Sequence, residues 1–142
     1  TGEDISAAFP DLLDSINAPA VLDGELVVYR DGRLGSFQDL QKRLGRRKPS
    51  RQLMAESPAH LIAYDALRLD GESLTDVPLT QRQQRLAAWL ERRAPERIHR
   101  SQPVWCTDLS ALIALQADAI AQPGGLIEGL MLKRRAGLYH SG

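Results

Sequence analysis

The chain has 142 residues, of which 43% are hydrophobic and 25% are charged, values ordinary for one globular domain or a piece of a larger one. Its 18 basic and 18 acidic residues cancel, so only a local patch of charge could indicate a nucleic-acid partner. A single cysteine, Cys106, excludes an internal disulfide and fits a reducing compartment, and no apolar run approaches the ~20 residues of a membrane span.

Hydrophobic spacing and turn signals predict a mixture of helices and strands. In chain order we expect a helix at 9–16, a strand at 21–29, a helix at 36–44, a helical turn at 52–56, a strand at 59–69, a helix at 81–93, a short strand within 98–105, a helix at 108–121 and a strand at 125–133. Asp31-Gly32 and Asp70-Gly71 are typical of tight hairpin turns. Hairpins without a strict strand–helix alternation favour an α+β fold with mainly antiparallel sheets.

Three of the expected helices carry recognisable start signals or apolar stripes. Ser36 and Asp39 have capping-box spacing, and Thr80 is a plausible cap for the helix at 81–93. The helix at 108–121 is predicted to be amphipathic, with its leucines and isoleucines mostly on one side.

Two expected strands share an unusual pattern in which a glutamate lies beside a glycine within an apolar run. Gly24-Glu25 lies in the strand at 21–29, and Glu128-Gly129 lies in the strand at 125–133. A carboxylate buried in such a run needs a partner, because an unpaired buried charge is costly. Glycine also allows another backbone or a ligand to approach closely. Two carboxylates facing one cleft would suit a divalent metal or ribose hydroxyls, whereas the simpler alternative pairs each glutamate with an arginine at a sheet edge.

Other candidate residues each have a functional and a structural interpretation. Tyr64, beside Asp65 in the strand at 59–69, could stack on a base or be an ordinary core tyrosine. A basic run could meet phosphates or form a solvated helix end; it comprises Lys42, Arg43, Arg46, Arg47, Lys48 and Arg51. The three histidines lack metal-like spacing and are interpreted as surface or structural residues, and Cys106 as a small core residue.

Taken together, these stretches resemble the adenylation (nucleotidyltransferase) domain of ATP-dependent DNA ligases, with the bacterial members most similar. The resemblance rests on three motifs in the family's order and spacing: residues 22–27 (LDGELV) look like motif III, 63–67 (AYDAL) like motif IIIa, and 128–133 (EGLMLK) like motif IV. Three further stretches also match the usual sequence pattern of the family: residues 36–41 with Arg43, residues 70–72, and Pro78-Leu79 with Arg82. The similarity covers essentially the whole chain.

The resemblance implies a fold and a set of site residues. The fold would belong to the DNA ligase/mRNA capping type, which is ATP-grasp-like. Glu25 would contact the ribose and help to hold the metal, Tyr64 would stack on adenine, Lys133 would lie at the nucleotide, and Glu128 would bind Mg²⁺. Tyr64 stands where many members have phenylalanine, a change that preserves stacking.

One element of the family pattern is missing. The nucleophilic lysine of ligases lies in a Lys-x-Asp-Gly element upstream of motif III, and this chain has no such element; its lysines are Lys42, Lys48 and Lys133. We therefore assign no catalytic residue here, and we expect residues 1–142 to be a central part of the adenylation domain, without the upstream lysine motif and the downstream motif V. The fragment alone is expected to be inactive.

The resemblance implies that the parent enzyme uses ATP and Mg²⁺ and seals nicked double-stranded DNA through lysyl-AMP and DNA-adenylate intermediates, in the bacterial cytoplasm, without a membrane partner. Two alternatives stay open at this point. One is an RNA ligase or capping-type nucleotidyltransferase. The other is a non-catalytic α+β module that binds nucleic acid through the basic run between Lys42 and Arg51.

Overall fold

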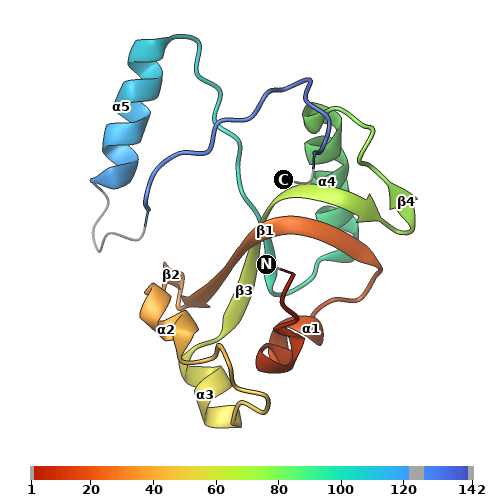
Figure 1. Ribbon diagram of the computed structural model, residues 1–142, viewed down its shortest axis with the longest axis vertical. Helices are drawn as coiled ribbons and strands as arrows, with labels where there is room; N and C mark the ends of the chain where they lie inside the picture. Colours follow the sequence, from red (N-terminus) through yellow and green to blue (C-terminus); the bar gives the residue numbers. More distant parts are fainter. Residues whose placement is uncertain (1, 122–126, 141–142) are drawn as a thin grey trace.

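The computed structural model describes residues 2–121 and 127–140 (Figure 1). Its elements, in chain order, are a 3-10 turn η1 (Ser6–Ala8), α1 (Pro10–Leu13), β1 (Ala20–Arg30), β2 (Arg33–Leu34), α2 (Phe37–Gln41), α3 (Arg51–Glu56), β3 (Ala59–Leu69), β4 (Glu72–Ser73), α4 (Leu79–Arg93), β5 (Ile98–Arg100) and α5 (Leu109–Ile120). Among the helices of these residues, none is both long and apolar enough to cross a bilayer.

Two long strands, β1 and β3, form the centre of a five-stranded sheet. They run antiparallel, and the short strands β2 and β4 extend them in the order β2-β1-β3-β4. β5 pairs with β3 in parallel, which makes the sheet mixed but mostly antiparallel. The turn residues Asp31, Gly32, Asp70 and Gly71 all have positive φ, as tight hairpin turns require. The α+β prediction, both hairpins and the strand at 59–69 are confirmed.

β3 carries one more residue than β1 at each of two places. The pairing passes from Val21 with Arg68 to Leu22 with Ala66, and then from Asp23 with Asp65 to Gly24 with Ala63. Leu67 and Tyr64 are thus bulge residues without a partner on β1. A bulge bends the strand, increases its twist and re-aims a side chain, and bulges are common beside functional sites.

Gly24 lies where the second bulge brings the two backbones together. A Cβ at this position would lie 2.6 Å from the carbonyl oxygen of Ile62 and 3.0 Å from the Cα of Ala63. The expectation of a close approach at this glycine is therefore confirmed, and the approaching group is the neighbouring strand. Gly129, the glycine beside the other glutamate, has nothing within 4 Å of its Cβ position.

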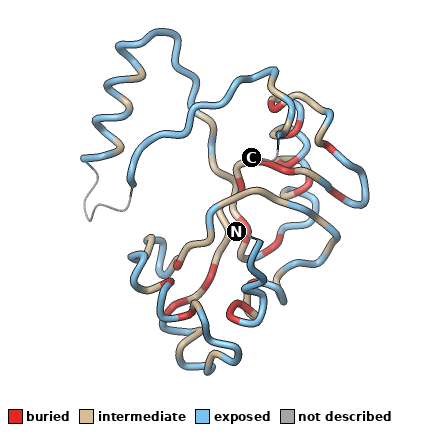
Figure 2. Tube along the Cα trace, in the orientation of Figure 1, coloured by how far each residue is buried: buried red, intermediate tan, exposed pale blue. Residues whose placement is uncertain are grey.

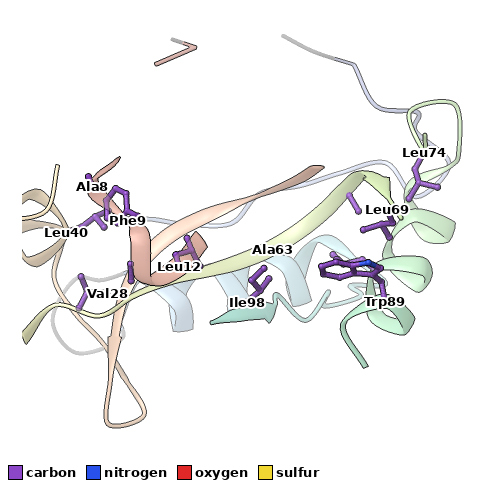
Figure 3. Close-up of a cluster of buried hydrophobic side chains, with 13 residues drawn as sticks. Ala8, Phe9, Leu12, Val28, Leu40, Ala63, Leu69, Leu74, Trp89 and Ile98 are labelled. Carbon is purple, nitrogen blue, oxygen red and sulfur yellow. The ribbon is translucent and has the colours of Figure 1, made fainter. Parts of the chain in front are cut away.

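Helices cover one face of the sheet and form the core with it. Buried residues follow β3 and the inner sides of α1 and α4 (Figure 2). The cluster runs along the sheet from Phe9 and Leu40 at one end to Trp89 and Leu74 at the other (Figure 3). Trp89 is fully buried, and its indole N–H donates to Asp70 at 3.2 Å. The core therefore fixes β1, β3 and α4 relative to one another.

Local signals predicted several element boundaries correctly. The Ser36 hydroxyl accepts from the Asp39 N–H while the Asp39 carboxylate accepts from the Ser36 N–H, so the predicted capping box is confirmed. Hydrogen bonds from Lys42 and Ser36 lower the pKa of Asp39 to about 2. Asp108 caps α5 by accepting from the N–H of Ala111.

Other predictions about helices were wrong. α4 begins at Leu79 after Pro78 without a side-chain cap, because the first amides of α4 find backbone acceptors in another segment, so Thr80 is not the cap. The expected helix at 9–16 is only the short α1 after η1. None of the α5 residues is buried, and Leu109 and Ile113 are exposed, because α5 stands apart from the sheet (Figure 1).

The predicted buried strand at 125–133 was also wrong over its described part. Residues 127–134 form no strand and are exposed. Positions 125 and 126 lie outside the described residues.

Candidate functional site

Tyr64 lies at the bulge of β3, on the opposite side of the strand from α4. Its neighbours Ala63 and Asp65 are both buried, and Asp65 is bonded to Arg82 of α4. Adjacent residues of a strand point to opposite faces, so the half-buried Tyr64 ring faces away from the helix layer. β3 therefore holds the aromatic ring on a rigid part of the sheet.

Lys133 lies directly over this ring. Its Nζ is 4.3 Å from the Tyr64 ring centroid, a cation–π distance. Lys133 is exposed and lies in a segment without helix or strand structure. A cation beside an aromatic ring is an arrangement that can meet a flat base and an attached anion.

Two carboxylates, those of Asp23 and Glu25, lie near Tyr64. Burial raises the pKa of Tyr64, and the carboxylates of Asp23 and Glu25 raise it further. The Tyr139 hydroxyl donates to Asp23 Oδ2 at 3.5 Å, and the pKa of Tyr139 is raised by burial and then by Asp23. The predicted residues Glu25, Tyr64 and Lys133 are thus brought together, along with Asp23 and Tyr139, to which sequence reasoning assigned no role.

Beneath Tyr64, Asp65 and Arg82 form a buried ion pair. The Arg82 Nε and Nη2 donate to the two carboxylate oxygens of Asp65, each at 2.7 Å, and both side chains are at most 3% exposed. The same guanidinium donates through Nη1 to the carbonyl oxygens of Val77 and Gly137. Asp65 is therefore structural support for the strand and is not available to a ligand. The only sequence signal for Arg82 was that it belongs, with Pro78-Leu79, to a stretch that resembles the ligase family.

Glu128 differs from the buried carboxylate that its apolar neighbours predicted. It is exposed and lies in the segment without strand structure, and Glu25 is exposed as well. Within residues 2–121 and 127–140, neither glutamate forms an ion pair with a lysine or arginine, so the alternative of two sheet-edge salt bridges is wrong for the described chain. Glu128 makes no hydrogen bond or ion pair with Glu25 or Tyr64 in that part either.

Among the described residues, no three His, Cys, Asp or Glu side chains gather as a metal-ion site. Mg²⁺ typically takes one or two protein carboxylates and completes its shell with water and substrate phosphates. The exposed carboxylates of Glu25 and Glu128 fit such a role, in which each supplies one ligand to the metal ion. Protein side chains alone would not complete the coordination shell.

The basic run divides into one structural residue and several exposed ones. Arg43 is fully buried, where its guanidinium donates to Asp11 and to the carbonyl oxygens of Ala8 and Ser57. It also lies 5.0 Å from the centroid of the Phe9 ring. Arg43 is therefore unable to meet phosphates, whereas the other members of the run are exposed.

The structure pairs two of the histidines and corrects the prediction for Cys106. Strands β3 and β5 bring His60 Nδ1 to 2.8 Å from His99 Nε2, with the rings stacked and Tyr29 beside both, which agrees with a structural role for these two histidines. The two histidines meet because β3 and β5, which are far apart in sequence, pair in the sheet. Cys106 is exposed and is not a core residue.

Two surface hollows lie away from Tyr64. One, of about 520 Å³, is lined by Val28, Arg30, Asp31, Arg33, Leu34, Gly35, Ser36 and Asp39. The other, of about 250 Å³, is lined by Leu69, Glu72, Leu74, Arg85, Ala88, Trp89 and Arg92. Neither touches the cluster of Glu25, Tyr64 and Lys133, which lies on an open face of the sheet.

Comparison with known proteins gives consistent results. The family model described as "ATP dependent DNA ligase domain" matches residues 1–142. A DNA ligase of Natronomonas pharaonis is 30% identical over 145 residues, covering 99% of this chain and 25% of the relative. A probable DNA ligase of Sorangium cellulosum is 32% identical over 143 residues, covering 97% of this chain and 25% of the relative. The chain thus spans about a quarter of the length of these relatives.

Solved structures support the same fold. The ligase domain of M. tuberculosis LigD superposes with a TM-score of 0.70 at 23% identity, covering 99% of this chain and 42% of that one. A mycobacterial DNA ligase D, solved in complex with ATP and MES, gives a TM-score of 0.58 at 24% identity, covering 87% of this chain and 34% of that one. Because the family model covers the whole chain and the fold agrees, this chain belongs to the ATP-dependent DNA ligase domain family.

Proposed function

We propose that this chain forms the nucleotide-holding part of an ATP-dependent DNA ligase, which seals nicks in double-stranded DNA through lysyl-AMP and DNA-adenylate intermediates. The observation that supports this most strongly is the cluster of Glu25, Tyr64 and Lys133 on one face of the sheet, in a chain of this family. Each of the three carries a chemistry that AMP requires: a ring for the base, an acceptor for hydroxyls and a cation for phosphate.

In this proposal the adenine base of ATP stacks on Tyr64. Stacking of a base on an aromatic side chain contributes about 1–3 kcal/mol. Lys133 occupies that face of the ring in the ligand-free chain, so it moves aside as the base arrives and turns its ammonium towards the phosphates. Glu25 accepts hydrogen bonds from the ribose.

Mg²⁺ is proposed to be held by Glu128 and Glu25 together with the phosphates of ATP. When bound, it would offset the negative charge of the transferring phosphoryl group. The exposure of both carboxylates leaves them free to take up such a role.

The nucleophilic lysine is proposed to come from outside these 142 residues. None of Lys42, Lys48 and Lys133 lies in a Lys-x-Asp-Gly element. We expect this chain alone to form no covalent adduct with labelled ATP and Mg²⁺, and the full-length protein to form one; a stable adduct on the isolated chain would refute this assignment.

The full-length protein allows a test of the Tyr64 role. Tyr64→Ala should weaken ATP binding by about 1–3 kcal/mol, or roughly 5- to 150-fold, whereas Tyr64→Phe should retain it because the ring remains. Tyr29→Ala removes an aromatic side chain from β1 outside the cluster and serves as the control. Equilibrium binding of labelled ATP measures the effect, and equal affinities in all four proteins would contradict the stacking role.

The metal role and the substrate are tested separately. Glu128→Ala should reduce self-adenylylation and raise the Mg²⁺ concentration that it needs, and normal labelling at low Mg²⁺ would contradict that role. Sealing of nicked DNA but not of nicked RNA distinguishes a DNA ligase from an RNA ligase or capping-type enzyme. Salt-dependent DNA binding without any labelling by ATP would instead support the non-catalytic module.

A further inference from the structure

Arg82 of α4 connects two parts of the molecule that carry the proposed nucleotide site. Two of its nitrogens hold the Asp65 carboxylate on β3, next to Tyr64. The third, Nη1, donates to the Gly137 carbonyl oxygen at 3.1 Å and to the Val77 carbonyl oxygen at 2.5 Å. The side chain is 3% exposed; its bonds to Asp65 are buried, and those to Val77 and Gly137 are partly buried.

Gly137 belongs to a segment that we call the strap, residues 134–139, which follows Lys133 directly. The strap lies across the start of α4. The N–H groups of Leu79 and Thr80 donate to the carbonyl oxygens of Gly137 and Arg135 at 2.9 and 3.1 Å, and the N–H of Tyr139 donates to Thr75 at 3.1 Å. The strap thus supplies the acceptors that the first turn of the helix otherwise lacks.

Tyr139 completes the connection between the strap and the site. Its ring centroid lies 5.8 Å from the Arg82 guanidinium, and its hydroxyl reaches Asp23, the carboxylate beside Tyr64. The buried guanidinium is therefore the point at which β3, α4 and the strap meet. Tyr64 is the neighbour of Asp65 on β3, and Lys133 directly precedes the strap, so each lies next to a segment that Arg82 holds.

We propose that Arg82 is a positioning residue for the nucleotide site: it fixes the strap, and with it the backbone from which the Lys133 side chain reaches the nucleotide beside Tyr64. This rests on the proposed function, because the consequence for ATP follows only if ATP binds at Tyr64. Within the described residues, Arg82 makes no hydrogen bond or ring contact with Tyr64 or Lys133. It acts through the Asp65 carboxylate on one side and the strap backbone on the other, and a planar fork of donors is suited to holding several acceptors in fixed directions.

The position of the strap can be measured without ATP. In the full-length protein, Arg82→Lys should speed hydrogen exchange of the Tyr139 amide, and speed tryptic cleavage after Lys133, Arg134 and Arg135, by about tenfold, as expected when a segment opens locally. Arg85→Met is the matched control, since Arg85 lies on the same helix, is exposed and pairs with the exposed Glu72. Equal exchange and cleavage in wild type and Arg82→Lys would overturn the proposal.

A second variant is needed in case Arg82→Lys, which changes the buried Arg82–Asp65 pair, does not fold. Tyr139→Ala leaves Arg82 and Asp65 intact and loosens the strap from its other side. It should speed cleavage after Lys133 in the same way, while the urea midpoint of the whole protein changes little. Unchanged cleavage in this variant would equally overturn the proposal.

The effect on the site separates positioning from stability. In self-adenylylation by the full-length protein, Arg82→Lys and Tyr139→Ala should raise the KM for ATP about 10- to 100-fold, as small misplacements of binding groups do, with a smaller change in kcat. Arg85→Met should match the wild type. If the wild type binds no ATP, the proposed function fails. If the wild type binds ATP and both variants keep its KM, the positioning role alone fails.

Discussion

At the scale of single residues, two buried arginines hold the helices to the sheet. Arg43 joins α1 to the start of β3 through Asp11, Ala8 and Ser57, and Arg82 joins α4 to β3 through Asp65. Removing one partner of a buried charge pair typically costs about 3–5 kcal/mol, because the other charge is left unpaired. Both arginines are therefore structural, although Arg43 lies in a run of basic residues that looks like a phosphate-binding patch in the sequence.

The His60–His99 pair should make stability depend on pH. Burial lowers the pKa of His60, and the neighbouring His99 and Arg97 lower it further, against the opposing effects of Asp11 and Glu96. The unfolded chain then binds a proton more readily than the folded chain. The stabilisation is complete above the ordinary histidine pKa of about 6.5 and is lost as the pH falls below it.

Urea unfolding between about pH 7.5 and pH 5 measures this dependence, because histidines are the side chains that titrate in that window when unperturbed. The urea midpoint should fall with decreasing pH, and His60→Gln should flatten the decline. His140→Gln, at an exposed position outside the pair, should keep the wild-type slope. A slope that survives in His60→Gln would show that this pair does not cause it.

At the scale of elements, the bulge in β3 determines where the candidate site lies. In the regular part of the pairing, Glu25 lies opposite Ile62 and Val27 opposite His60, so alternate residues of β1 share a face of the sheet. A single sequence contains no signal for the bulge. A residue is recognised as extra only when its strand is aligned with the neighbouring strand, and that pairing is known only from the structure. Gly24 was the visible clue, since glycine in a strand interior often marks a close approach.

Gly24→Ala should destabilise the fold. The added Cβ would lie 2.6 Å from a backbone carbonyl oxygen of Ile62, so β1 and β3 would have to separate. We expect a loss of about 1–3 kcal/mol, the usual cost of overpacking. Gly129→Ala, with open space at its Cβ position, is the control and should leave the urea midpoint unchanged. Equal midpoints for both variants would mean that the sheet accommodates the methyl group at Gly24.

At the scale of the whole molecule, stability is concentrated in the sheet and α4. Leu86 and Trp89 of α4 are buried against the sheet, while the apolar residues of α5 and of the segment 127–132 are largely exposed. α5 stands beside the rest of the fold and carries no buried side chain (Figure 2).

Substitutions in the two helices should therefore differ sharply in effect. Leu86→Ala in this chain should cost about 2–5 kcal/mol of unfolding free energy, because it leaves a cavity against β3. Ile113→Ala on α5 should change it by less than about 0.5 kcal/mol, as exposed substitutions do. Urea denaturation measures both. A large loss in Ile113→Ala would mean that α5 packs against the sheet in solution.

The sequence by itself determined the two long strands, most of the helices, both hairpin turns, the cap of α2 and the α+β class, because these depend on residues close together in the chain. It also indicated Glu25, Tyr64 and Lys133 as a set, through their resemblance to ligase motifs. Only the tertiary structure decided which charges are buried, that Tyr64 is a bulge residue under Lys133, and that Arg82 ties the strap to β3. The strap lies more than 50 residues from Arg82 in sequence, as the 55-residue separation of Arg82 and Gly137 illustrates. Such contacts form when distant segments pack together, and hydrophobic spacing within one segment shows what it can bury but not what will cover it.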